Sequence, residues 1–154
     1  MSKWYGYDEF QPSDGDKRIQ YVAGFLFEGD NVALIRKLRP AWQTGKLKGI
    51  GGHIEHGETP TQAMTREFLE ETGYRTTATQ WWPFAILSGE NHVVHFFASY
   101  GALKELKSTT DEEVIVIPIS EVTAENAIPN LTWLIPMARE ISSSSVYTYH
   151  IREE

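Results

Sequence analysis

Three glutamates with helical spacing lie near the middle of the chain, in the segment TREFLEETG that starts at Thr65. Glu67, Glu70 and Glu71 stand at i, i+3 and i+4, so in a helix they share one face. Like charges on one face destabilise an isolated helix, and a bound cation is the usual compensation. The chain has no cysteine, and carboxylate oxygens favour Mg²⁺ or Mn²⁺ over zinc. The pattern therefore indicates a magnesium site that Mn²⁺ could also occupy.

Residues before these glutamates can support such a site. Glu58 can fold back onto the acidic face, and Arg66 can pair with a carboxylate and hold it in place. The Gly51–Gly52 pair lets the backbone approach a metal or phosphate closely. A stretch with five cations and no acid precedes the glycines: Arg36, Lys37, Arg39, Lys46 and Lys48. This stretch is either a solvated basic loop or a surface that binds phosphate.

The helix that must carry the glutamates has clear limits. Thr59 is a good N-cap, Pro60 suits the first helical position, and Gln62 completes a capping box. Gly73 suits the C-terminal stop. We therefore expect a helix from Thr59 to Gly73.

Further elements must surround this helix. Alternating apolar residues and turn signals predict strands at 19–27, 32–36, 46–50, 79–87, 93–100, 114–119 and, at the edge, 146–151. A second helix is expected from about Asn130 to Ile141, with Pro136 either kinking it or delaying its start. This order predicts an α/β fold, with helices on both faces of a mixed sheet. The length of 154 residues favours a single domain, with residues 1–18 as an N-terminal arm and residues 142–154 as a tail.

The glutamate segment resembles the Nudix box. From Gly52 it runs Gly-x5-Glu-x7-Arg-Glu-Phe-x-Glu-Glu-x-Gly-Tyr to Tyr74, and all seven invariant residue types are in place. Phe68 and Tyr74 replace the aliphatic residues usual in the family, but both are packing positions. The resemblance implies the Nudix fold, an α/β/α sandwich with a mixed β-sheet flanked by helices, over roughly residues 19–141.

The resemblance also implies roles for these residues. One backbone carbonyl and three carboxylates would bind metal: Gly51, Glu67, Glu70 and Glu71. Glu67 would be a ligand or the base, Glu58 would support the metals, and Arg66 would orient a glutamate. Family members hydrolyse nucleoside diphosphates linked to another group by attack of water on phosphorus. The metal ions lower the pKa of that water and neutralise phosphate charge.

Several residues outside the box are candidates for substrate or metal contact. The stretch GKLKGIGGHIEHGET resembles that of MutT-type enzymes, which hydrolyse oxidised purine nucleoside triphosphates. Arg36 and Lys37 are the best candidates for phosphate contact, and His53 is either a further one or a surface histidine. A late loop in this family often brings an extra carboxylate to the metals. Glu112 and Glu113 are the candidates, or are simply exposed loop acids.

The base end of a substrate is less well specified. In MutT-type enzymes an Asn or Asp near the start of the last helix reads the purine edge, and Asn130 stands there, although Asn is also a preferred N-cap. Trp42 and Trp133 could stack on a base or belong to the core. The segment Gln80–Phe84 partly resembles the SQPWPFPxS array of NADH-cleaving relatives. It lacks most of that array's polar residues and prolines, so we expect a strand with buried aromatic residues there.

Composition limits the remaining possibilities. The net charge is −7, which disfavours non-specific nucleic-acid binding, and no apolar run approaches the roughly 20 residues of a membrane span. A polar N-terminus and the absence of cysteine favour a cytoplasmic location. We expect a small-molecule nucleotide as partner, with a nucleoside triphosphate hydrolysed to monophosphate and pyrophosphate. The alternatives are ADP-ribose or another nucleotide sugar, a dinucleotide, a capped 5′ end, or a non-catalytic nucleotide sensor. The chain could be a monomer or a homodimer.

Overall fold

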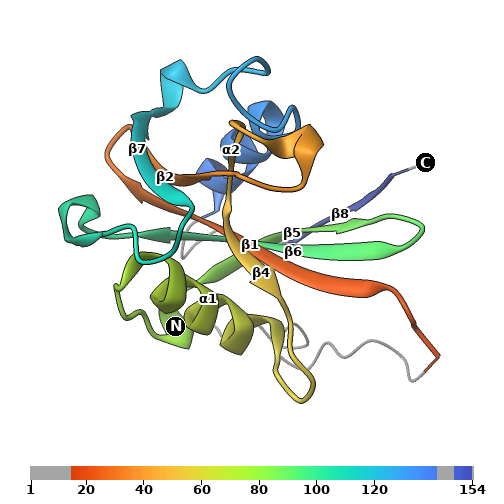
Figure 1. Ribbon diagram of the computed structural model, residues 1–154. Helices are drawn as coiled ribbons and strands as arrows, with labels where there is room; N and C mark the ends of the chain where they lie inside the picture. The colour runs from red at the N-terminus through yellow and green to blue at the C-terminus, as the bar shows by residue number, and fades with distance from the viewer. Residues whose placement is uncertain (1–14, 142–147, 154) are drawn as a thin grey trace.

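The computed structural model describes residues 15–141 and 148–153, which form a mixed β-sheet with one α-helix on each face (Figure 1). The strands are β1 (Ile19–Glu28), β2 (Asn31–Arg36), β3 (Leu47–Lys48), β4 (Ile50–His53), β5 (Trp82–Ser88), β6 (His92–Tyr100), β7 (Glu113–Pro118) and β8 (Tyr149–Arg152). The helices are α1 (Pro60–Thr72) and α2 (Leu131–Glu140), with short 3-10 turns η1 (Ala41–Gln43), η2 (Ala78–Gln80), η3 (Leu103–Glu105) and η4 (Ile119–Glu121). The predicted α/β sandwich is confirmed.

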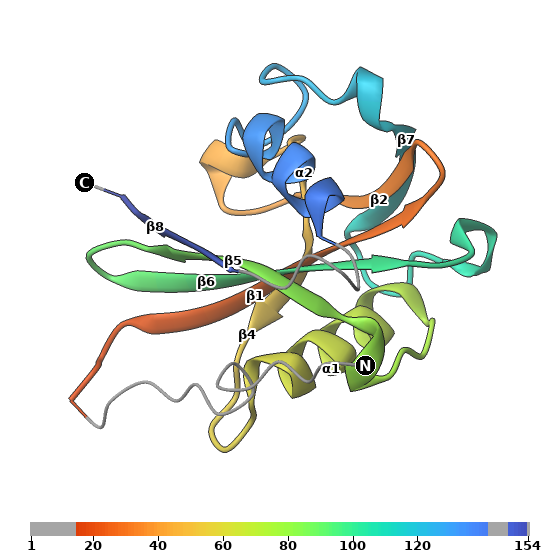
Figure 2. The same ribbon diagram turned by 180° about the vertical axis from the view of Figure 1, so that it is seen from behind.

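The sheet separates two hydrophobic cores. Its strand order is β3-β2-β1-β6-β5-β8, with β4 beside β1 and β7 beside β2. The pairs β1–β6 and β5–β8 are parallel, and the other pairs are antiparallel. Alternate residues of β1 serve opposite cores: Val22 and Leu26 pack with α1, while Phe25 and Phe27 pack with α2. Figure 2 shows the two helices on either side of the sheet from behind.

The sequence signals for α1 all act as expected. The Thr59 hydroxyl accepts a hydrogen bond from Gln62 N at 3.1 Å, and Gln62 Oε1 accepts one from Thr59 N at 2.9 Å. Gly73 ends the helix with φ +71°, a left-handed conformation that glycine adopts without strain. Ala63, Met64 and Phe68 are fully buried on the inner face. The three glutamates therefore lie on another face of α1, where Glu67 meets β4 and Glu71 meets the loop before β7.

Three element predictions need correction. The strand expected at 46–50 is two strands, because the chain leaves β2 after Lys48 and joins β1 from Ile50 onward. The strand expected at 79–87 begins only at Trp82, after η2, although its aromatic residues are largely buried as predicted. Pro136 lies inside α2 and does not delay its start.

The structure describes the two ends of the chain only in part. Strand β8 takes up the later part of the strand expected at 146–151, while residues 146–147 and most of the expected N-terminal arm lie outside the described residues. In the described parts of the chain, no helix has both the length and the apolar character needed to cross a bilayer.

Candidate active site

The centre of the site is the close packing of α1 on β4. A Cβ atom added to Gly52 would lie 2.6 Å from the carboxyl carbon of Glu67, so any other residue there would displace that carboxylate from its present position. The side chain of Glu67 is 12% exposed. Burial raises its pKa, although a hydrogen bond from Arg66 acts in the opposite direction. Glu67 is thus a partly desolvated carboxylate that packs against Gly52 in β4.

Arg66 ties the surroundings of this carboxylate together. Its Nε and Nη2 donate to the two oxygens of Glu58 at 2.7 and 2.9 Å, and its Nη1 donates to Glu67 at 2.9 Å. Nη2 also donates to the His53 carbonyl at 2.9 Å, and a Glu70 oxygen lies 3.3 Å from Nη1. The hydrogen bonds from Arg66 lower the pKa of Glu58. Glu58 therefore anchors Arg66, and Arg66 holds Glu67 in place.

Glu71 faces the loop before β7. Thr110 Oγ1 donates a hydrogen bond to its carboxylate at 2.8 Å. Burial raises the pKa of Glu71, and the negative charges of Glu112 and Glu70 add to the effect. Glu70 is the most solvent-exposed of the three α1 carboxylates, at 54%. The three side chains expected on one face therefore differ in exposure and in partners.

The two late-loop glutamates lie in different surroundings. Glu112 is buried, and it accepts hydrogen bonds from Lys37 Nζ at 2.9 Å and from Leu38 N at 2.7 Å. Burial raises the pKa of Glu112, but these two hydrogen bonds outweigh it and hold the pKa below its usual range. Glu113 is exposed and lies 3.6 Å from Arg36. Only Glu112 is brought toward the α1 glutamates.

The oxygen-rich face of α1 fits a hard divalent cation. Carboxylates and the Gly51 carbonyl are hard ligands, and a bound cation would stabilise the charged forms of Glu67 and Glu71, whose pKa values are raised by partial burial. Within residues 15–141 and 148–153, however, no three acidic or imidazole side chains converge into a closed cage. Arg66 lies between Glu67 and Glu70 and contacts both. The residues that would hold a cation are thus close to one another, but in this structure they do not form a complete coordination site.

A second group of expected contact residues lies around the start of α2. Asn130 is the N-cap residue of α2, as its sequence position indicated, but its side chain makes no capping hydrogen bond. Its Oδ1 atom is buried and has no hydrogen-bond partner in the part of the chain that the structure describes. Trp42 and Trp133 are 70% and 40% exposed, which argues against core positions. The two tryptophan rings are therefore accessible from solvent, whereas the Asn130 oxygen is enclosed.

Sequence reasoning missed Gln43 and named Lys48 only as one of the five cations of the basic stretch. Gln43 is buried in η1, and its Oε1 atom also lacks a partner among the described residues. Backbone bonds between Leu47 and the segment 126–128 bring the end of this loop beside the chain that leads into α2. No periodic signal could have found Gln43, whereas Lys48 belongs to the basic stretch. The His53 ring packs against the Tyr21 ring in a tilted arrangement, with 4.7 Å between the ring centroids and 36° between the ring planes.

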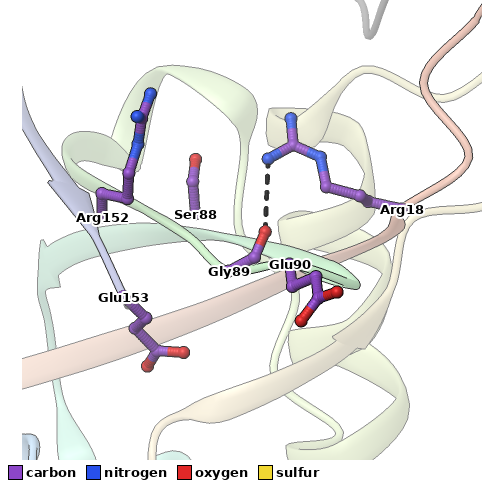
Figure 3. Close-up of a pocket in the computed structure, with 6 residues that line it drawn as sticks. All are labelled: Arg18, Ser88, Gly89, Glu90, Arg152 and Glu153. Carbon is purple, nitrogen blue, oxygen red and sulfur yellow. Dashed lines mark hydrogen bonds between the residues drawn. The ribbon is translucent and has the colours of Figure 1, made fainter.

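A separate pocket lies at the tip of the β5–β6 hairpin, away from α1 (Figures 1 and 3). It is lined by Arg18, Ser88, Gly89, Glu90, Arg152 and Glu153. Arg18 donates to the Gly89 carbonyl at 3.5 Å, but Asp16 already binds its guanidinium. Two cations and two acids line the pocket, so it has no net charge that would select a ligand. The α1 region therefore remains the candidate active site.

Comparison with known proteins agrees with this geometry. The NUDIX domain family matches residues 17–137, so the chain belongs to that family. It is 40% identical over 58 residues to an 8-oxo-dGTP diphosphatase of Escherichia coli K12, a match that covers 37% of this chain and 45% of that protein. The chain spans about half the length of the curated relatives it matches. The predicted family, with its MutT-type character, is confirmed.

Solved structures share the fold at low sequence identity. A NUDIX hydrolase from Nitrosomonas europaea has a TM-score of 0.71 at 17% identity, covering 90% of this chain and 81% of its own. A bifunctional NMN adenylyltransferase/ADP ribose pyrophosphatase from Francisella tularensis, complexed with AMP and a manganese ion, has a TM-score of 0.65 at 18% identity. That match covers 85% of this chain and 42% of the other. These similarities concern the fold alone.

Proposed function

We propose that this chain is a Mg²⁺-dependent hydrolase, also active with Mn²⁺, that cuts a nucleoside triphosphate into the monophosphate and pyrophosphate. The observation that carries the proposal is the partly buried Glu67 carboxylate, fixed against Gly52 by Arg66 and flanked by Glu70 and Glu71. This arrangement concentrates negative charge, which a divalent cation would balance and could then bridge to an anionic phosphate.

Different residues have different roles in the proposed hydrolysis. A bound divalent cation supplies Lewis acidity that activates water and neutralises the phosphate oxygens. Glu67 is the preferred proton acceptor, because its raised pKa brings it closer to neutral pH than an ordinary carboxylate. Arg66 and Glu58 hold Glu67 in orientation. Water adds to phosphorus, the bond to the bridging oxygen breaks, the proton passes to Glu67, and pyrophosphate leaves.

Purine nucleotides are the preferred substrate class. The exposed rings of Trp42 and Trp133 offer stacking surfaces, and the buried Asn130 and Gln43 oxygens can accept hydrogen bonds from amino or imino groups of a base. The name of the E. coli relative, 8-oxo-dGTP diphosphatase, favours an oxidised purine triphosphate. The Francisella enzyme, with its ADP ribose pyrophosphatase activity, keeps a nucleotide sugar as the second candidate.

The experiment is a substrate panel with Mg²⁺ and, separately, Mn²⁺. It contains canonical and oxidised (d)NTPs, ADP-ribose, NADH, dinucleoside polyphosphates and capped RNA, with released phosphate and pyrophosphate scored. The proposal expects pyrophosphate from a purine triphosphate. Turnover of ADP-ribose alone would replace the substrate assignment. Thermal stabilisation by a nucleotide without any product would instead identify a non-catalytic sensor.

A further inference from the structure

Lys48 lies on the same side of the sheet as the α1 glutamates. In the strand registers Ile35 pairs with Lys48 on one side and with Val114 on the other. Ile35 is buried in the core beneath α1, and Val114 packs against the same core. Directly paired residues point to the same face of a sheet, as do residues two apart on a strand. Lys48, Lys37 and Glu112 therefore project toward the α1 side.

Leu47 and Arg36, the neighbours of Lys48 and Lys37 in the sequence, lie on the opposite face of the sheet. Leu47 belongs to the core beneath α2 and pairs with Arg36. Arg36 donates to the Gly45 carbonyl at 3.3 Å and lies near Glu113. Arg36, one of the expected phosphate contacts, is therefore directed away from Lys37, and Lys48 stands beside Lys37 in its place.

The Lys48 ammonium lies within the influence of the Glu112 carboxylate but contacts no carboxylate among the described residues. The Lys37 ammonium is matched by Glu112 at 2.9 Å, whereas Lys48 makes no hydrogen bond or ion pair among the described residues. Its side chain is partly buried. Burial and the neighbouring charge of Lys37 lower the pKa of Lys48, while the charge of Glu112 partly opposes them. A partly desolvated ammonium with no direct partner is well suited to bind an anionic ligand.

The Lys48 ammonium lies close to the α1 glutamates. The charges of both Glu112 and Lys37 act on the pKa of Glu71, and the same two residues act on that of Lys48. Arg66, a third cation of this region, already donates to Glu58 and Glu67. Lys48 is thus the cation beside the acidic face whose hydrogen-bond donors remain available.

We propose that Lys48 binds the phosphoanhydride chain of the substrate, donating to non-bridging phosphate oxygens beside the α1 glutamates. The inference rests on the proposed function, since it names a residue that holds the substrate of that function. A lysine ammonium is a compact point charge with three donors, which suits phosphate oxygens. Lys48 would also offset part of the repulsion between the glutamates and the incoming phosphates.

The test uses inorganic pyrophosphate with Mg²⁺ as the probe, measured by calorimetry on the full chain. Lys48→Met should weaken binding about tenfold or more, because a charge-assisted hydrogen bond is lost. Lys48→Arg should retain most of the affinity. Lys104→Met is the matched control, because it removes the same charge from an exposed position in η3 and should leave binding unchanged.

Thermal stability separates a binding role from a structural one. Methionine has no ammonium to desolvate, so Lys48→Met should melt at the wild-type temperature or above it. A lowered melting temperature in Lys48→Met, with wild-type pyrophosphate affinity, would mark a structural lysine. Weakened binding of an unphosphorylated nucleoside would assign Lys48 to the base, and failure of the wild-type chain to bind pyrophosphate would also overturn the inference.

The two proposals can fail separately. Wild-type chain that binds pyrophosphate through Lys48 but cleaves nothing in the substrate panel would contradict only the proposed function. A Lys48→Met variant that binds pyrophosphate like wild type, while wild type hydrolyses nucleoside triphosphates, would contradict only the role of Lys48.

Discussion

At the scale of single residues, the site depends on a planar guanidinium placed among carboxylates. Arg66 contacts Glu58 through two nitrogens and Glu67 through a third, which a lysine could not reproduce. Glu70 stands at the edge of this network, and more than half of its side chain is exposed. Catalytic and structural roles can therefore be separated at Glu70 more cleanly than at Glu67.

Glu70→Gln should lower kcat by roughly 10²–10⁴-fold, as expected for a lost ligand or acid–base group, while the fold stays intact. The variant keeps the shape of the side chain and removes only its charge. Steady-state kinetics with Mg²⁺ on the best substrate of the panel measure the loss. Glu121→Gln, at an exposed position in η4, is the control. Wild-type kcat in Glu70→Gln would rule out the assigned site.

Asn130→Ala should change the ranking among purine and pyrimidine triphosphates with little change in melting temperature. The reason is that the side chain caps no backbone group and its oxygen lacks a partner among the described residues. The ratio of kcat/KM values across bases measures the effect. An equal loss for all bases together with a lower melting temperature would show that Asn130 has a structural role.

At the scale of elements, α1 carries charges that oppose its own folding. The pKa of Glu71 is raised by burial above its ordinary value of 4.5, so the folded state binds this proton more tightly than the unfolded chain does. Stability therefore falls as the pH rises from about 4.5 through the folded-state pKa, and the cost is fully present above that pKa. A cation bound to the folded state would offset this cost at neutral pH.

Glu71→Gln should accordingly melt at or above the wild-type temperature at pH 7 in the presence of a chelator. Near pH 3, where the wild-type carboxyl is protonated, the difference should vanish. Added Mg²⁺ should raise the melting temperature of wild type more than that of the variant. Thermal scans at two pH values with and without Mg²⁺ provide the measurement. A variant less stable than wild type at pH 7 without metal would contradict this account.

At the scale of the whole molecule, long-range contacts build the site from distant segments. The Lys37–Glu112 pair joins the end of β2 to the loop before β7, and Thr110 in that loop reaches Glu71 on α1. Both partners of the ion pair are largely buried, with 20% and 9% of their side chains exposed. Removing one partner leaves the other charge buried without compensation.

Glu112→Gln and Lys37→Met should each lower the free energy of unfolding by about 2 kcal/mol. The double variant should lose less than the sum, because the two changes remove one shared interaction. Denaturant unfolding of the four proteins in this cycle measures the coupling. Asp111→Asn is the control, since the neighbouring Arg39–Asp111 pair is mostly exposed and should contribute little. Strict additivity would show that the Lys37–Glu112 contact is not energetically coupled.

The sequence by itself determined what depends on short-range spacing. The helix from Pro60 to Thr72, its caps and the shared face of Glu67, Glu70 and Glu71 all follow from the 3.6-residue period and from local hydrogen bonds. The family followed from the same segment. These features could be predicted because they involve residues within about 20 positions of one another.

Only the tertiary structure decided which distant side chains join that segment. Strand register, which residues 36–48 alone do not fix, directs Lys37 and Lys48 toward α1 and Arg36 away from it. It likewise separates Glu112 from Glu113, two adjacent acids that looked equivalent. The face of each side chain is set by pairing with strands far along the chain. For that reason the candidate phosphate and base contacts, unlike the glutamate helix, could not be resolved from the sequence.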